Sequence, residues 1–278
     1  MKIKQNVSIL ILTLNEEINI ISCLSSLKWA EDIVFLDSKS KDNTCALARK
    51  MGARVVIHSF DNWASHQNWA LKNIKFKNSW VFYLDADERM TSELKDEILS
   101  IAADPTNPKV AYFCGRKNYL WGKWIKHAFP PGYILRFFKP QNVQFERLVN
   151  PTPVIQGQHG YLKNYFEHYN FSKGLEEWFA KHNRYSTLEA QEGTKTLKLP
   201  WKFSNLFSMD SYKRRQSLKS LSFRMPFRPC LKFVYLYFFK RGFLDGRAGF
   251  VYCVLQSIYE YMITVKMREL RIKQAKTS

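Results

Sequence analysis

Four short apolar runs, each followed by a polar turn and a segment with helical spacing, shape the chain from residue 7 to residue 103. The runs are typical of buried strands and span residues 7–12, 33–36, 54–57 and 80–84. Helices are expected between them at residues 18–27, 44–51 and 66–74, with Asp42 or Asn43 as the N-cap of the second helix and Gly52 at its end. Strands joined by helical crossovers lie parallel in a sheet that helices cover on both faces. The pattern therefore predicts an α/β fold around a mostly parallel central sheet.

Polar and acidic side chains follow three of these strands. Residues 13–16 follow the first strand, Asp37 ends the second, and Asp85 and Asp87 follow the fourth as an Asp-x-Asp (DXD) triplet. Each group could be an ordinary turn, but the carboxyl ends of parallel strands meet at one edge of the sheet, where open α/β sheets bind nucleotides. Carboxylate oxygens are also ligands that Mg²⁺ and Mn²⁺ prefer. The three strand ends therefore predict a site for a divalent cation and a diphosphate.

Several protein classes lose support because their motifs are missing. No Gly-x-Gly-x-x-Gly follows the first strand and no Gly-x-x-x-x-Gly-Lys-Ser/Thr occurs, which argues against dinucleotide oxidoreductases and P-loop nucleotidases. The five cysteines are scattered and form neither a zinc pattern nor a disulfide framework, which favours a reducing compartment. Residues 1–4 lead into the first strand without a signal peptide, so we expect the protein on the cytosolic side of the membrane.

Motifs along most of the chain resemble those of a known enzyme family. Thr13-Leu14-Asn15-Glu16-Glu17, the stretch from Asp37 to Thr44, Gln67-Asn68-Trp69-Ala70-Leu71 and Leu84-Asp85-Ala86-Asp87-Glu88-Arg89 resemble, in order and spacing, the inverting family 2 glycosyltransferases with a GT-A fold. Motifs around Arg136, His168, Arg184 and residues 238–246 resemble the bacterial branch that includes lipopolysaccharide-core β-1,4-glucosyltransferases of the WaaE type. The resemblance implies a Rossmann-like nucleotide-binding fold and transfer of a sugar, with UDP-glucose as donor and a lipopolysaccharide inner-core heptose as acceptor.

The resemblance also implies roles for individual residues. The residues expected to bind the nucleotide-sugar donor are Thr13, Asn15, Glu16, Asp37, Gln67, Asp85, Arg136 and Arg184. Asp87, with help from Asp85, would ligate Mg²⁺ or Mn²⁺, which neutralises charge on the departing UDP. His168 would bind the acceptor, although a histidine next to Tyr169 is as often a packing residue. For the two arginines, an exposed surface position is the ordinary alternative.

The acceptor base is the point at which the chain departs from the family. Relatives usually read Val-His-Glu after the strand that carries Arg136, whereas this sequence reads Val149-Asn150-Pro151. If the alignment with the family motif is shifted by one gap, Glu146 takes the position of the base. Glu88, beside the metal motif, is a second candidate. The alternative for Glu146 is a surface glutamate paired with Arg147.

The net charge of +19 is concentrated toward the end of the chain, where basic and aromatic residues alternate. The chain from Lys213 onward contains 15 lysines and arginines but three acidic residues, a composition that suits an anionic membrane surface. A nucleic acid would also attract this charge, but no RNP-like or zinc motif is present, so we expect no nucleic acid to bind.

An amphipathic helix is expected with one apolar side made of Val251, Leu255, Ile258, Met262 and Val265. The alternative is a helix packed on the catalytic core. Gln256 and Glu260 interrupt the apolar residues 249–265, which argues against a full transmembrane span.

Three regions are expected: a nucleotide-sugar-binding half at residues 1–103, an acceptor-binding part at 104–200, and a basic helical segment at 201–278. Together these features predict a peripheral glycosyltransferase on the cytoplasmic face of the bacterial inner membrane. One alternative is an enzyme of the same fold that uses a polyprenyl-phosphate carrier or builds another cell-surface polysaccharide. The other is a basic membrane- or RNA-binding protein with a degenerate nucleotide site.

Overall fold

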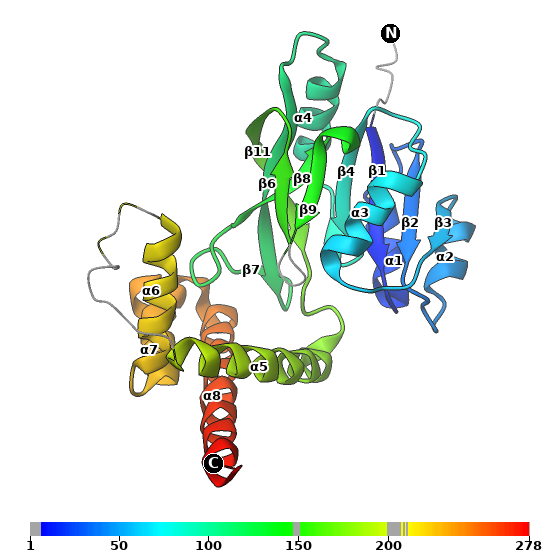
Figure 1. Ribbon diagram of the computed structural model, residues 1–278. Helices are drawn as coiled ribbons and strands as arrows, with labels where there is room; N and C mark the ends of the chain where they lie inside the picture. The colour runs from blue at the N-terminus through cyan, green and yellow to red at the C-terminus, as the bar shows by residue number, and fades with distance from the viewer. Residues whose placement is uncertain (1–6, 147–150, 199–206, 208, 210, 278) are drawn as a thin grey trace. The chain divides into compact units, whose positions relative to one another are not determined.

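The computed structural model describes residues 7–146, 151–198, 207, 209 and 211–277 (Figure 1). Contacts between residues divide the chain into two units. The first unit comprises the described residues up to Tyr119 together with those of Pro130–Ser172, and the second comprises Leu120–Phe129 and the described residues from Lys173 onward. Residues 173–198 are thus grouped with the C-terminal helices, whereas the sequence placed them with residues 104–172.

The first unit is built on a sheet with the strand order β3-β2-β1-β4-β8-β6-β11-β5. Its strands are β1 (Val7–Thr13), β2 (Ile33–Asp37), β3 (Arg54–Ile57), β4 (Trp80–Asp85), β5 (Glu88–Arg89), β6 (Lys109–Leu120), β8 (Tyr133–Phe138) and β11 (Gln158–His168). The strands β3, β2, β1 and β4 run parallel, as the sequence predicted. Beyond β4 the sheet is mixed, because β8 is antiparallel to both β4 and β6, whereas β11 is parallel to β6 and antiparallel to β5.

The helices of the first unit are α1 (Glu17–Ser25), α2 (Thr44–Lys50), α3 (Trp63–Asn73) and α4 (Ser92–Ala103), with a short 3₁₀ turn, η1 (Pro140–Asn142). The predicted helix positions are confirmed, but α3 begins three residues earlier than expected. Asn62 explains the earlier start, since its side chain accepts a hydrogen bond from the Ser65 N–H and so caps the helix. Gly52 ends α2 in the left-handed region with φ of +88°, as the sequence indicated.

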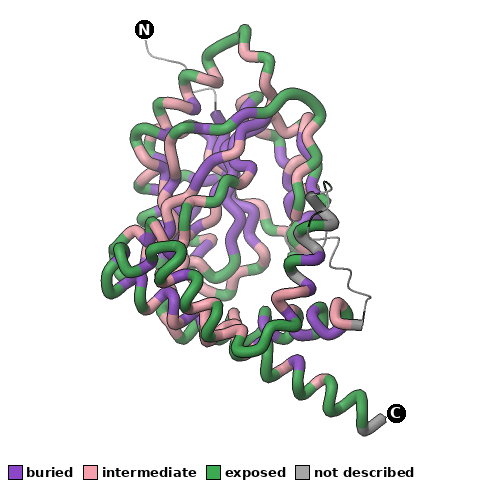
Figure 2. The backbone as a smooth tube through the Cα atoms, turned by 90° about the vertical axis from the view of Figure 1, so that its left-hand side faces the viewer, coloured by how far each residue is buried: buried purple, intermediate pink, exposed green. Residues whose placement is uncertain are grey.

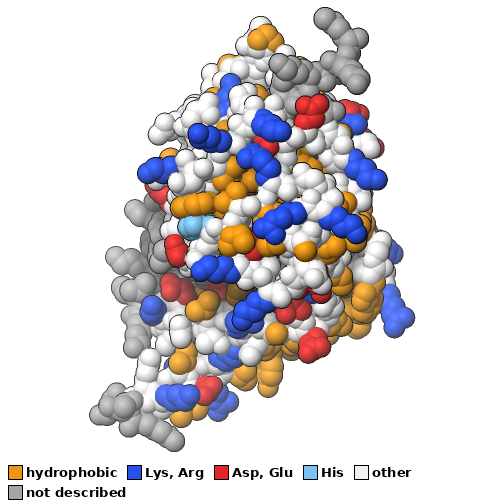
Figure 3. Space-filling model, turned by 90° about the vertical axis from the view of Figure 1, so that its right-hand side faces the viewer, with side chains coloured by type: hydrophobic (Ala, Val, Ile, Leu, Met, Phe, Trp, Pro, Cys, Tyr) orange, Lys and Arg blue, Asp and Glu red, His pale blue; other side chains and the backbone are white. Residues whose placement is uncertain are grey.

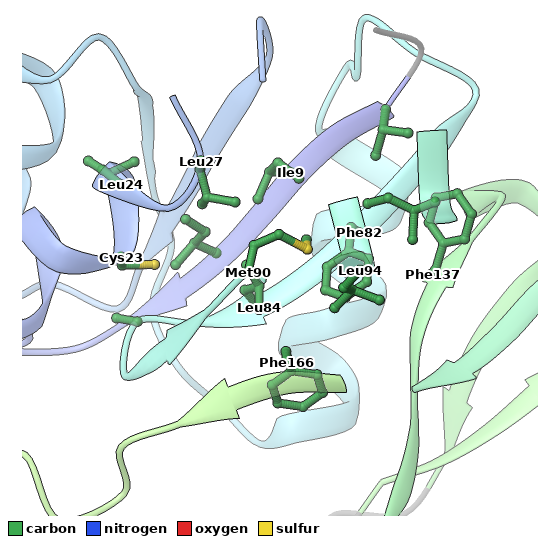
Figure 4. Packing of buried hydrophobic residues seen from close by; sticks show 14 of the residues in the cluster. Ile9, Cys23, Leu24, Leu27, Phe82, Leu84, Met90, Leu94, Phe137 and Phe166 are labelled. Carbon is green, nitrogen blue, oxygen red and sulfur yellow. The ribbon is translucent and has the colours of Figure 1, made fainter. Parts of the chain in front are cut away.

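Alternate residues of β1 face two hydrophobic clusters, one on each side of the sheet. Ile9 and Ile11 belong to one cluster, and Leu10 and Leu12 belong to the other. Figure 4 shows the first cluster, in which Phe82 of β4 lies near Leu94 of α4. Every residue of β1 is buried, and β2 and β4 on either side of it are buried at all positions but one (Figure 2). This two-sided burial explains why the strands are continuous apolar runs.

A small hairpin of β9 (Val143–Glu146) and β10 (Thr152–Ile155) completes the first unit. Asn68 of α3 anchors it, since the Asn68 amide donates to the Phe145 carbonyl and accepts from the Phe145 N–H, both at 2.8 Å. The loop between the two strands contains Arg147 and Asn150, so these two positions of the expected base motif lie outside the described residues.

The second unit is helical. It contains a short strand β7 (Lys123–Trp124), the helices α5 (Gly174–Lys198), α6 (Ser211–Arg224), α7 (Arg228–Val234) and α8 (Gly246–Thr277), a π-helical turn η3 (Tyr235–Phe239) and a 3₁₀ turn η4 (Gly242–Asp245). The helix α8 packs against both α5 and α7, and its last turns are exposed (Figure 2). Its buried positions are Ala248, Gly249, Tyr252, Cys253, Leu255, Ile263 and Met267.

The buried side of α8 differs from the apolar side that the sequence predicted, because of the five predicted residues only Leu255 is buried. Glu260, which the sequence placed on the polar side, forms a 2.8 Å ion pair with Arg228 of α7. The packing of α5 and α7 against α8 determines which of its residues are buried, and the membrane-facing role of the apolar residues stays a prediction. The segment Gly242–Ala275 has the length and apolar composition of a membrane-crossing helix, and 33% of its most apolar window is buried. It is longer than the interrupted run at residues 249–265 considered from the sequence, and core helices of soluble proteins can have the same composition.

Basic side chains are not confined to the second unit. Of the 43 lysines and arginines, 28 precede Lys213. Figure 3 shows one face of the molecule on which lysine and arginine side chains are spread among exposed hydrophobic ones.

Candidate functional site

The carboxyl ends of β1, β2 and β4 lie side by side, as the sequence predicted. In the parallel register Thr13 of β1 is opposite Asp37 of β2, and Leu12 is opposite Asp85 of β4. The Thr13 hydroxyl donates a 3.0 Å hydrogen bond to the Asp37 carboxylate. The polar residues at the three strand ends therefore converge on one edge of the sheet.

The loops that follow β1 and β2 are joined by hydrogen bonds. The N–H of Ser40 donates to the Asp37 carboxylate at 2.8 Å, and the Ser40 hydroxyl accepts from the N–H of Asn15 at 2.8 Å. The Asn15 side chain in turn accepts from the Lys41 N–H at 2.8 Å. Asn15 has φ of +53°, a left-handed conformation that asparagine tolerates better than most residues. Asp37 is only 1% exposed, and its hydrogen bonds to Thr13 and Ser40 anchor both loops.

The loop after β2 is also attached to the start of α1. The Glu16 N–H donates to the Thr44 hydroxyl at 2.7 Å, and Asp42 accepts from the Glu17 N–H at 3.1 Å and the Thr44 N–H at 3.0 Å. Asn43 is the N-cap residue of α2 by position, but Asp42 supplies the side-chain bond, so both candidates have a part in the cap. The elbow of residues 13–16 is thus held rigidly to the α2 loop.

Asp85 is held by a buried arginine. Arg136 of β8 donates to the Asp85 carboxylate at 2.8 Å and to the Glu88 carboxylate at 2.6 Å. Its guanidinium lies over the Tyr83 ring, 4.2 Å from the centroid, and the Tyr83 hydroxyl donates to Asp85 at 2.9 Å. Arg136 was expected near the diphosphate, but it is 3% exposed and paired with two carboxylates. This arrangement fits a residue that positions Asp85.

Glu88 belongs to the same hydrogen-bond network. It is fully buried, and its carboxylate accepts from the Asp85 N–H at 2.9 Å as well as from Arg136. Burial raises the pKa of Glu88, whereas the charge of Arg136 opposes that rise. A carboxylate without solvent access does not reach an acceptor hydroxyl in this conformation, and its contacts fit a positioning role beside Arg136.

Asp87 faces a histidine that is distant in sequence. The Nε2 atom of His168 lies 3.4 Å from the Asp87 carboxylate, because β11 pairs with β5 and places His168 opposite Glu88. The Nδ1 atom of His168 lies 2.8 Å from the side-chain oxygen of Asn118, which is fully buried on β6. An Nδ1–H that donates to this oxygen leaves the Nε2 lone pair directed toward Asp87. His168 was expected to bind the acceptor, but the structure places it beside the metal motif.

Asp87 and His168 provide a carboxylate oxygen and an imidazole nitrogen on one side of a possible metal position. Both ligand types suit Mn²⁺, and a carboxylate suits Mg²⁺. Within the described part of the chain, no three His, Cys, Asp or Glu side chains come together as a metal-binding group. A cation here would therefore share its coordination with substrate oxygens, which is usual for Mg²⁺ in phosphate-transfer sites.

Among the remaining predicted residues, Gln67 borders this network, because its side chain hydrogen-bonds that of Tyr83. Gln67 is 6% exposed on α3, and its side-chain oxygen lacks a hydrogen-bond partner among the described residues. Glu146 is exposed at the last position of β9, where its side chain forms no ion pair with a described residue. Arg184 lies in the second unit on α5, with a side chain 67% exposed and 3.9 Å from Glu177. The donor roles of Gln67 and Arg184 and the catalytic role of Glu146 stay predictions.

Comparison with known proteins gives a family match and full-length relatives. Residues 8–169 match the model of glycosyl transferase family 2, a range that includes all three strand ends and His168. An uncharacterized glycosyltransferase of Rickettsia typhi is 26% identical, with 97% of this chain and 89% of that protein covered. The lipopolysaccharide core biosynthesis glycosyltransferase LpsC of Rhizobium meliloti is 24% identical, with 98% of this chain and 96% of that protein covered. Among solved structures, the mannosyltransferase PcManGT from Pyrobaculum calidifontis, in complex with GDP-Man and Mn²⁺, covers 92% of this chain and 87% of its own, with a TM-score of 0.47 and 14% identity.

Proposed function

The chain belongs to glycosyl transferase family 2, and on that premise we propose that it moves glucose from UDP-glucose to a lipid-linked saccharide such as the lipopolysaccharide inner core. The observation that carries this proposal is the convergence of Asp37, Asp85 and Asp87 at the carboxyl edge of the parallel strands, with His168 beside Asp87. The near full-length similarity to LpsC supports an acceptor of the lipopolysaccharide core type.

Asp87 and His168 would hold Mn²⁺ or Mg²⁺ at this edge. The bound cation would neutralise negative charge on the departing diphosphate, which is Lewis-acid activation of a leaving group. Asn118 would keep His168 in the tautomer whose Nε2 is free to ligate, because it accepts from the Nδ1 side.

The other residues of the network would fix the donor. Arg136, Glu88 and Tyr83 hold the Asp85 carboxylate in one orientation, from which Asp85 would contact the ribose or the cation. The joined loops after β1 and β2 would hold the nucleoside, with Asp37 bonded to Thr13 and Ser40 as their anchor. A preorganised pocket of this kind avoids the cost of ordering the loops when the donor binds.

Glu146 would act as the base on the acceptor side. It would take the proton of the acceptor hydroxyl while that oxygen bonds to the anomeric carbon and the bond from this carbon to the diphosphate oxygen breaks. Its placement on β9 is supported by the paired hydrogen bonds between Asn68 and the neighbouring Phe145. No covalent intermediate with the protein is required, and the configuration at the anomeric carbon inverts.

A donor screen tests the proposal. The purified protein would be incubated with UDP-, GDP- and dTDP-sugars, with and without Mn²⁺, in the presence of lipopolysaccharide truncated at the inner core. We expect Mn²⁺-dependent transfer from UDP-glucose and a large loss of turnover in Glu146→Gln at an unchanged KM for the donor, since a base acts on the acceptor side only.

Transfer from a GDP- or dTDP-sugar in preference to UDP-sugars would overturn the donor assignment. Transfer to a polyprenyl phosphate and not to lipopolysaccharide would overturn the acceptor assignment. Full turnover in Glu146→Gln would show that another residue is the base. The matched control is Glu192→Gln on α5, another exposed glutamate, which should leave turnover unchanged.

A further inference from the structure

One end of the second unit exposes a cluster of aromatic and aliphatic side chains, here called the aromatic tip. Its members lie on η3, η4 and the start of α8, with exposed fractions of 57% for Phe238, 76% for Phe239, 46% for Phe243, 53% for Leu244 and 46% for Phe250. The ring of Tyr237 joins them, because its centroid lies 5.2 Å from that of Phe238, 6.2 Å from that of Phe243 and 5.7 Å from that of Phe250. Contiguous exposed rings of this kind mark an interaction surface.

The surroundings of the aromatic tip carry positive charge. Residues 232–250, which include the tip, contain four lysines and arginines and a single acidic residue, Asp245, which is only 3% exposed. Lys240, Arg241 and Arg247 are exposed in the same segment as the rings. Apolar rings bordered by basic side chains are complementary to an anionic lipid surface, whose head groups attract the charges and whose acyl region accepts the rings.

The backbone that carries the aromatic tip is held by close internal contacts. Asp245 accepts hydrogen bonds from the N–H groups of Lys126, His127 and Ala128 at 3.1, 2.9 and 2.8 Å, and its carboxylate lies 2.7 Å from Nδ1 of His127. A Cβ atom at Gly249 would lie 2.3 Å from the carbonyl oxygen of Gly242, so η4 and α8 approach as closely as glycine allows. The rings therefore sit on a preorganised support, which lowers the entropy cost of docking.

We infer that the aromatic tip is a membrane-insertion site, which places the rings of Phe238, Phe239 and Phe243 among the lipids of an anionic bilayer. The inference deepens the proposed function, on which it rests for the lipid-linked acceptor, by naming the surface that meets the membrane. An enzyme held at the membrane in this way meets an acceptor that cannot diffuse into the cytosol.

Polar contacts along α8 favour attachment of the protein at the membrane surface and argue against α8 as a transmembrane helix. Glu260 pairs with Arg228 of α7 at 2.8 Å. Lys266 donates to the Asn183 carbonyl at 2.6 Å and to the Ser186 and Thr187 hydroxyls at 2.8 Å, all on α5. These contacts bind the middle of α8 to helices of its own unit, and a helix that crossed the bilayer would have to break them or carry α5 and α7 with it.

Vesicle co-sedimentation tests the inference on the full-length protein. Vesicles of phosphatidylglycerol and phosphatidylethanolamine should pull down the wild type, and vesicles of phosphatidylcholine should not. The double variant Phe238→Ser/Phe239→Ser should lower the partition coefficient by at least about tenfold, because the apolar contribution is lost. The variant Lys240→Glu/Arg247→Glu should also bind less, with a weaker dependence on salt.

The matched control is Ile21→Ser/Leu188→Ser, which removes two exposed apolar side chains, 55% and 54% exposed, from other helices. It should bind as the wild type does. Equal partitioning of the control and the phenylalanine variant would overturn the inference. Retention of the wild type on membranes after alkaline carbonate extraction would also overturn it, in favour of a spanning helix. Binding of a single-stranded RNA probe that vesicles do not displace would assign the surface to nucleic acid.

Sugar transfer measured in the same samples separates this inference from the proposed function. Wild-type protein that binds vesicles but transfers no sugar would support membrane insertion of the aromatic tip and overturn the proposed function. Wild-type protein that transfers glucose in detergent but never binds vesicles would support the proposed function and overturn membrane insertion of the aromatic tip. The phenylalanine variant should keep wild-type transfer to an acceptor dispersed in detergent, which also shows that it is folded.

Discussion

His168 Nε2 lies 3.4 Å from the Asp87 carboxylate, although Asp87 is in the turn between β4 and β5 and His168 is at the end of β11, far along the chain. The pairing of β11 with the short strand β5 creates this contact, and Asn118 on the neighbouring strand β6 bonds the other nitrogen of the ring. A divalent cation ligated here would have one carboxylate and one oriented imidazole from the protein.

Replacing Asp87 with Asn should lower transfer from the nucleotide-sugar at least about a hundredfold at fixed Mn²⁺, because the leaving diphosphate loses the cation that neutralises it. The free energy of unfolding should change little. Initial rates together with thermal unfolding measure both quantities. Asp96→Asn on α4 is the control, since its carboxylate is 69% exposed and pairs with the adjacent Lys95. Wild-type rates in Asp87→Asn would contradict this role.

Replacing His168 with Ala should raise the Mn²⁺ concentration needed for half-maximal activity by about 10- to 100-fold, with partial recovery at saturating metal. Asn118→Ala should shift the same curve in the same direction by a smaller factor, because it removes the partner that orients the ring. Metal titrations of both variants test this. A lower kcat at an unchanged metal requirement would instead support the acceptor role that the sequence predicted for His168.

Arg136→Met should reduce the free energy of unfolding by about 3 kcal/mol, because it leaves the fully buried Glu88 without its ion-pair partner. Arg49→Met on α2, where the arginine is exposed, should cost within about 0.5 kcal/mol and serves as the control. Urea unfolding of both variants provides the comparison. If Arg136 bound the diphosphate directly, its replacement would weaken donor binding and leave stability nearly intact.

Acidification should destabilise the protein through His66. This side chain is 1% exposed, and burial together with the neighbouring His58 lowers its pKa below the usual 6.5. The unfolded chain therefore binds more protons than the folded one as pH falls below 6.5, so the free energy of unfolding must drop in that range. Unfolding curves recorded between about pH 7 and pH 5 measure the slope, which His66→Gln should reduce.

The control for that experiment is His159→Gln, which removes an exposed histidine of β11. It should leave the slope unchanged. A slope in His66→Gln equal to that of the wild type would show that other groups account for the acid sensitivity.

The parallel half of the sheet could be predicted from the sequence because its signals are local. The runs that became β1 and β4 are apolar on both faces, and Gly52 marks the end of α2. Once these strands are taken as parallel neighbours, the convergence of Asp37 with Asp85 and Asp87 follows from geometry.

The contacts of Arg136 and His168 could not be predicted because they depend on strand order. Arg136 meets Asp85 only because β8 inserts antiparallel beside β4, and His168 meets Asp87 only because β11 lies next to β5. No local periodicity specifies either neighbour. The buried side of α8 escaped prediction for a similar reason, since it depends on where α5 and α7 pack against the helix.

Calorimetric titration of the protein with UDP, in the presence and absence of Mn²⁺, tests the central claim most directly. The claim is that Asp87 and His168 hold the cation that binds a nucleotide diphosphate at the carboxyl edge of the sheet. We predict UDP binding that depends on Mn²⁺, that is lost in Asp87→Asn and that persists in Asp96→Asn. Equal UDP affinity with and without Mn²⁺, or unchanged binding in Asp87→Asn, would contradict it.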